Sequence, residues 1–84
     1  MDIVMTTDYG LFTQYLNVIN RYEEKLRYKD NGLNTEDIVY IQTVLDQAKK
    51  KMLDAVDAMT AIDIFYSHIW YNDKLNRLIK KYNL

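Results

Sequence analysis

The sequence predicts an all-α protein: an antiparallel helical hairpin with one long helix and a short C-terminal helix, completed as an oligomeric helical bundle. Three observations support this fold class. Apolar residues recur at alternating steps of three and four through most of the second half of the chain, which is the spacing of a buried helix face. Proline is absent from the 84 residues, and glycine occurs only twice, so strong helix breakers are nearly missing. At this length we expect a single domain.

The first helix is expected over about residues 8–29. Its buried stripe follows the helical spacing and comprises Phe12, Tyr15, Ile19, Tyr22 and Leu26. The charged residues within 21–27 fall mostly on the opposite face. The helix is expected to end in segment 29–32, where an asparagine and a glycine can adopt the left-handed backbone conformation that closes a helix.

The second and longest helix is expected over about residues 35–70. Asn34 or Thr35 can accept hydrogen bonds from the free backbone N–H groups of the first turn. An unbroken apolar seam then follows, made of Ile38, Ile41, Leu45, Ala48, Met52, Ala55, Met59, Ile62, Tyr66 and Ile69. A second interpretation breaks the helix near residues 59–63, where Thr60 and Asp63 have the spacing of a capping box. The continuity of the seam favours one helix.

A short third helix is expected over about residues 73–83. Asn72 and Asp73 have the character of an N-terminal cap. The apolar stripe of this helix is short and consists of Leu75, Leu78, Ile79 and Tyr82.

The lengths of the first two helices predict self-association. About 35 residues form a rod of ~50 Å, whereas about 22 residues span only ~33 Å. A hairpin would therefore leave part of the long helix uncovered, and a second copy of the chain is expected to cover it, with a dimer as the expected state. The expected oligomer seam is Leu45, Ala48, Met52, Ala55, Met59, Ile62, Tyr66 and Ile69.

Composition excludes several classes of protein. The chain has no cysteine and one histidine, so disulfides, thiolate zinc sites and multi-histidine metal sites within one protomer are excluded. The net charge of -1 argues against a general nucleic-acid binder. No apolar run is long enough to span a bilayer, and no signal peptide is recognisable. We therefore expect no cofactor, no membrane partner and a cytoplasmic location, in a bacterial or archaeal host if the gene is viral.

No arrangement of residues predicts catalysis. Ser67 and His68 are adjacent, and neighbours on a helix point about 100° apart, so we do not expect them to act as a nucleophile and its base. Asp54, Asp57 and Asp63 recur along the long helix without the Glu-x-x-His motif of helical metal sites, so a solvated acidic face is expected. The sequence therefore predicts a protein that is not an enzyme.

The aromatic residues near the end of the long helix are the best candidates for contact with a partner. Only Tyr66 lies on the seam, which leaves Trp70 and Tyr71 without an obvious place in a two-helix core. Tryptophan and tyrosine dominate binding hot spots. The predicted partner-binding residues are Phe65, Trp70, Tyr71, Lys74 and Arg77. Packing of the aromatic residues beneath a folded-back C-terminal segment is the alternative.

Residues 42–56 contain the pattern Thr-x-Leu-x-Gln-Ala, followed by Ala-Val. This pattern resembles the helical hairpins of phage proteins that sequester cyclic-nucleotide immune signals. The resemblance covers about a sixth of the chain, and we transfer no binding residue from it.

By analogy with small helical proteins of phages and mobile elements, the leading hypothesis is an inhibitor or regulator that binds and occludes an unidentified protein. One alternative is an oligomer that binds or sequesters a nucleotide-type ligand. A further alternative is a regulator that binds nucleic acid through the basic C-terminal helix.

Overall fold

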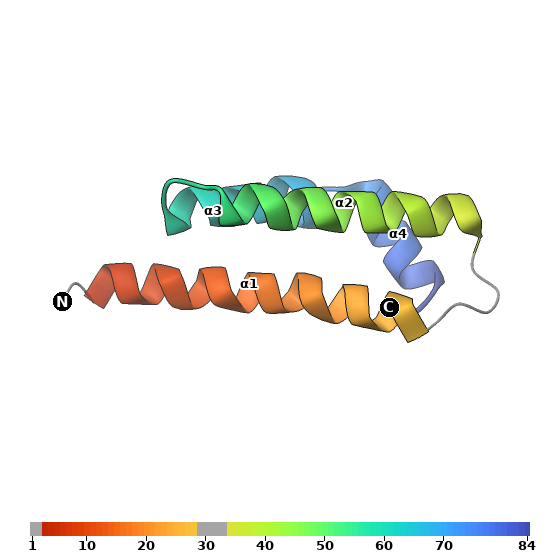
Figure 1. Cartoon of the computed structure of the whole chain (residues 1–84), viewed down its shortest axis with the longest axis horizontal. Helices are drawn as coiled ribbons and strands as arrows, with labels where there is room; N and C mark the ends of the chain where they lie inside the picture. The colour runs from red at the N-terminus through yellow and green to blue at the C-terminus, as the bar shows by residue number, and fades with distance from the viewer. Residues whose placement is uncertain (1–2, 29–33) are drawn as a thin grey trace.

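The computed structural model describes the backbone of residues 3–28 and 34–84 and the side chains of residues 10–28 and 34–84. Over these residues the chain is helical and has no strand, which confirms the all-α fold class. The helices are α1 (Ile3–Tyr28), α2 (Thr35–Leu53), α3 (Ala58–Phe65), the π-helix η1 (Tyr66–Trp70) and α4 (Asp73–Lys81). Figure 1 shows α1 and α2 side by side in opposite directions, after which the chain turns back and runs through α3 to α4 in the direction of α1.

The prediction of one long helix over residues 35–70 is wrong, because the chain turns back between α2 and α3. The backbone N–H of Asp54 closes α2 by donating to the carbonyl of Lys50 at 3.0 Å. Asp57 then caps α3, since its Oδ1 accepts a hydrogen bond from the backbone N–H of Thr60 at 2.7 Å. Hydrogen bonds from the backbone and the side chain of Thr60 lower the pKa of Asp57. The break lies at residues 54–57, just before the alternative position at 59–63.

The physical reason for the turn is the burial of the seam. A single rod would leave its second half uncovered, whereas the fold-back places α3 in contact with both α1 and α2. Ala61 and Phe65 of α3 are buried in the same core as Leu45 and the rest of the inner face of α2, and Ile62 is buried as well. The chain thereby covers its own apolar strip, within dimensions of 49 × 19 × 19 Å.

Most of the predicted oligomer seam is therefore internal. Leu45, Ala48, Met52, Ile62 and Ile69 are buried, Ala55 and Tyr66 are half-buried, and Met59 is exposed. Met59 lies outside because the inner face of α3 is made by Ala58, Ala61, Ile62 and Phe65. The seam offers no uncovered strip to a second copy. Self-association stays a prediction, and it requires another surface.

Helix α1 begins at Ile3, five residues before the expected start, and its last described residue is Tyr28. The expected helix end in segment 29–32 lies outside the described residues. In the stripe of α1, Ile19 and Leu26 are buried, and Phe12, Tyr15 and Tyr22 are half-buried against the core.

Two asparagines hold the joint between η1 and α4. Asn72 caps α4, because its Oδ1 accepts hydrogen bonds from the backbone N–H of Leu75 at 2.9 Å and from the hydroxyl of Tyr40 at 3.2 Å. The side-chain amide of Asn76 lies 3.0 Å from the carbonyls of both Ile69 and Trp70, and 2.9 Å from that of Asn72. These bonds give the carbonyls of Ile69 and Asn72 a second donor beside their backbone partners, and they also bind the carbonyl of Trp70 at the end of η1. The direction of α4 is thereby fixed relative to η1.

Asn72→Ala is expected to lower the free energy of unfolding by about 1 kcal/mol or more, because it removes the cap of α4 and the partner of the Tyr40 hydroxyl. Urea unfolding followed by circular dichroism measures the change. Asn72→Asp keeps an acceptor at the same place and should retain most of the stability. An alanine variant as stable as the wild type would show that this cap contributes little.

A carboxyl pair lies between α1 and α2. Glu23 is half-buried, and its Oε1 is inaccessible to solvent and has no hydrogen-bond partner among the described residues. Burial raises the pKa of Glu23, and a hydrogen bond with Asp46 raises it further, while Lys49 and Arg27 oppose the shift. A carboxyl group whose pKa is higher in the folded chain binds more protons there. Its contribution to stability is therefore present at low pH and falls as pH rises above about 4.5.

Glu23→Gln is expected to raise the melting temperature at neutral pH and to flatten its decline as pH rises from 4 to 7, since an amide carries no charge to bury. Thermal unfolding across this range tests the expectation. Glu24→Gln, on the exposed neighbour, serves as the control and should leave the wild-type pH profile in place. Identical pH profiles for the wild type and Glu23→Gln would show that the pair does not control stability.

Candidate functional site

The aromatic residues predicted to bind a partner divide into a buried part and an exposed part. Phe65 was predicted to contact a partner, and this is wrong for the folded chain, because its ring is buried and stacks on Tyr15 of α1 at a centroid distance of 4.3 Å. The turn at residues 54–57 brings the inner face of α3 onto α1, and Phe65 lies on that face. Trp70 and Tyr71 lie outside the core and are 58% and 77% exposed.

Trp70 and Tyr71, together with the half-buried Tyr66, form what we call the aromatic face. The ring of Trp70 stacks on that of Tyr66 with a centroid distance of 4.9 Å and an interplanar angle of 10°. The hydroxyl of Tyr66 shares a hydrogen bond of 2.8 Å with that of Tyr15, and this bond raises the pKa of Tyr66. Tyr71 lies against the other rings with its centroid 6.3 Å from that of Tyr66. The exposed rings are therefore connected through Tyr66 and Tyr15 to the buried core.

The aromatic face lies on a π-helix. The backbone N–H of Tyr71 donates to the carbonyl of Tyr66 at 2.8 Å, which is the five-residue bond of this helix type. π-helical turns are rare, and they are frequent at functional sites. Asn72 and Asn76 hold the end of this turn, so the two exposed rings sit on a fixed backbone. The sequence contained no signal for the π-helix.

The two basic residues predicted to accompany the aromatic rings lie apart from them. The ammonium of Lys74 lies 4.2 Å from the ring centroid of Tyr40, so it faces α2, whereas Trp70 lies against Tyr15 of α1. Arg77 is exposed and lines an open hollow of about 470 Å³ together with Asp73, Asn76 and Lys80. We therefore restrict the candidate site to the aromatic face.

The basic C-terminal helix does not present its cations as one patch. Lys74 lies on Tyr40, and the ammonium of Lys81 lies 3.8 Å from the carboxylate of Asp37, which also accepts a hydrogen bond from the hydroxyl of Tyr82. Arg77 and Lys80 lie on another side of α4. No observation therefore favours a nucleic-acid site over the aromatic face.

Ser67 and His68 approach each other more closely than the sequence predicted. The expectation that these neighbours point apart is wrong, because Ser67 Oγ lies 3.1 Å from His68 Nδ1. Nδ1 also lies 3.0 Å from the carbonyl of Ile64, and the ammonium of Lys51 lies 3.4 Å from Nε2. A carbonyl accepts and an ammonium donates, so Nδ1 carries the proton and Nε2 accepts. In this tautomer the nitrogen beside Ser67 cannot take up the serine proton.

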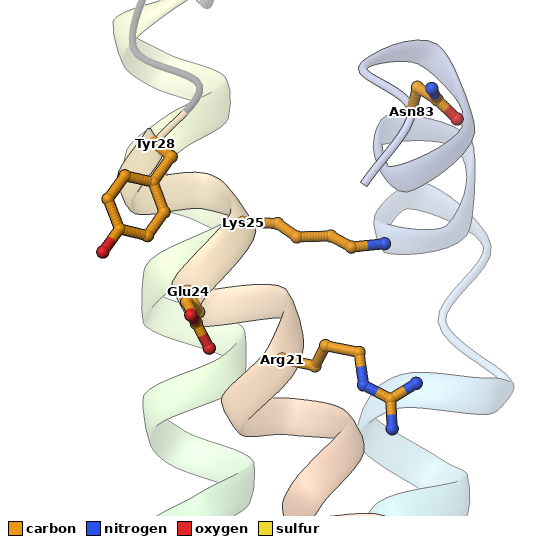
Figure 2. A pocket seen from close by; sticks show the side chains of 5 residues that line it. All are labelled: Arg21, Glu24, Lys25, Tyr28 and Asn83. Atoms are coloured by element: carbon orange, nitrogen blue, oxygen red, sulfur yellow. The ribbon is translucent and has the colours of Figure 1, made fainter.

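An open groove lies between α1 and the end of the chain. It has a volume of about 510 Å³ and is lined by Arg21, Glu24, Lys25, Tyr28 and Asn83. Figure 2 shows Arg21 and Lys25 extending from α1 in the same direction, while Glu24 and Tyr28 lie on the other side of the helix. The ammonium of Lys25 donates to the backbone carbonyl of Leu84 at 2.7 Å. The groove thus combines two cations with an exposed aromatic ring.

Among the described residues no group of histidines and carboxylates has the arrangement of a metal site. Within the same part of the chain no helix is long and apolar enough to cross a membrane. Comparisons with family models, with curated proteins and with solved structures found no match to this chain.

Proposed function

We propose that this protein is a non-enzymatic helical interaction protein, active as a homo-oligomer, that binds and occludes a partner protein through its aromatic face. It would act as an inhibitor or regulator of the kind found in phages and mobile elements. The observation that carries the proposal is the pair of exposed rings at Trp70 and Tyr71, ordered on a fixed turn and backed by Tyr66. A preordered ring loses little entropy on binding, which is why such residues form hot spots.

Trp70→Ala combined with Tyr71→Ala is expected to abolish capture of the partner, with a loss of affinity of at least about 30-fold for each hot spot. The partner is first isolated from host-cell extract with the wild-type chain and identified, and its affinity for purified variants is then measured. Because Trp70 is the only tryptophan, binding should also change the position of the intrinsic fluorescence.

Tyr28→Ala is the matched control, since Tyr28 is about as exposed as Tyr71 but lies on α1. This variant should bind the partner as the wild type does. Circular dichroism should show unchanged helicity in all variants, because none of the three rings is part of the buried core. Full binding by the doubly substituted chain would disprove the role of the aromatic face.

A second candidate function is the binding of a nucleotide-type anion in the groove between α1 and the chain end. The observation in its favour is that Arg21, Lys25 and the exposed ring of Tyr28 line one groove, since phosphate binds to cations and a base stacks on an aromatic ring. Figure 2 shows the ring on the opposite side of α1 from the two cations, which separates the two parts of such a site. The carboxylate of Glu24 in the same groove opposes an anion. We therefore place this function second.

Native mass spectrometry of the chain purified from cells tests the second candidate. A retained small anion is expected, and Arg21→Ala combined with Lys25→Ala should release it. Lys50→Ala, an exposed lysine outside the groove, should retain the ligand. A wild-type mass without any adduct, together with no binding of added nucleotides at low salt, would exclude this function.

A further inference from the structure

The turn between α2 and α3 exposes apolar side chains that neither the core nor the aromatic face uses. Leu53, Val56 and Met59 are 58%, 90% and 65% exposed and follow one another at steps of three residues. We call these three residues the corner patch. Water-exposed apolar residues at single positions are ordinary, whereas three of them around one turn make that turn a candidate interaction surface.

The corner patch lies beside a hollow of matching character. A cavity of about 260 Å³ is lined by Phe12 of α1 and by Met52, Leu53, Ala55, Asp57 and Ala58. Five of these six side chains are apolar, and two are alanines that leave room. The same end of the molecule thus has both a projecting apolar side chain, Val56, and a hollow of the size that accepts one.

A surface with a projection beside its own complementary hollow fits a second copy of itself. A two-fold axis between two chains brings the same patch of both subunits together, so that every contact between a residue of one copy and a different residue of the other occurs twice. The charged residues around the patch are also suited to contact with an identical surface. Lys50 and Lys51 lie in the last turn of α2, and Asp54 and Asp57 follow within six residues. Two positive and two negative charges on one segment can pair reciprocally across such an axis.

Helix α1 provides a further argument for a second copy. Figure 1 shows its first turns continuing past the α2–α3 turn, where no other described helix of the chain lies opposite them. Helices in proteins draw most of their stability from packing against other elements. A second chain seated on the corner patch would lie beside these turns and cover them.

We propose that two copies of this chain associate about a two-fold axis through the corner patch, with Val56 of each copy entering the hollow of the other. This proposal specifies the surface for the self-association assumed in the proposed function. Of the predicted oligomer seam, this interface retains Met59 of the patch and Met52 and Ala55 of the hollow. The contact is small, so the dimer should form in a concentration-dependent manner.

Sedimentation equilibrium over a range of concentrations tests the proposal. The wild-type chain should shift from its mass of 10.1 kDa to twice that value as concentration rises. Val56→Asp should be monomeric throughout and equally helical, because Val56 lies outside the core. Val39→Asp is the matched control, since Val39 is an exposed valine on α2 away from the patch, and it should still dimerise.

A mixing experiment tests the two-fold contact itself. Val56→Lys and Ala58→Glu should each dimerise more weakly alone and should form a heterodimer when mixed. The lysine introduced at position 56 of one chain then meets the glutamate introduced in the hollow of the other, while the second contact joins an unchanged Val56 to an unchanged hollow. A general loss of structure would not be rescued by mixing. Retention of the dimer by Val56→Asp would overturn the corner patch while leaving self-association in place. A wild-type chain that stays monomeric would overturn both, whereas the aromatic face is judged separately by partner affinity.

Discussion

The constraint on which the structure depends is the burial of one continuous apolar strip by a chain with few helices to cover it. The strip over residues 38–69 is too long for α1 to cover as a straight rod. The chain meets this constraint by turning at residues 54–57, so that the two halves of the strip face each other and α1. The turn costs several helical hydrogen bonds, and capping by Asp57 replaces one of them. The burial of Phe65 and the exposure of the corner patch follow from this turn.

The sequence predicted the helical class and the start of α2, because periodicity and capping are local properties. It could not locate the turn from periodicity, since a connection of four residues is close to one helical turn of 3.6 residues and leaves the apolar spacing in phase. The local signal was the side chain of Asp57, three residues before Thr60, which is the spacing of an N-cap. The capping-box spacing of Thr60 and Asp63 predicts a break slightly later than the N-cap at Asp57.

The candidate site was predictable in part. Trp70 and Tyr71 could be identified as exposed because they fall off the seam, and this does not depend on where the helix breaks. The contacts of Phe65 and Lys74 do depend on the position of the break. Phe65 stacks on Tyr15, and Lys74 lies over the ring of Tyr40, only because the chain folds back. The π-helix could not be predicted either. Its wider turn is stabilised by Asn76, whose amide reaches carbonyls six and seven residues earlier in the chain.

The aromatic face and the corner patch lie apart on the molecule, so that one chain can use both surfaces at once. Trp70 follows Asp57 by thirteen residues, which is a distance of about 20 Å along the helix. A dimer formed through the corner patch would leave both aromatic faces uncovered, one on each subunit. Two faces on one rigid particle can bind a dimeric or repetitive partner with an affinity well above that of either face alone. Self-association would then strengthen occlusion without adding any contact to the aromatic face itself.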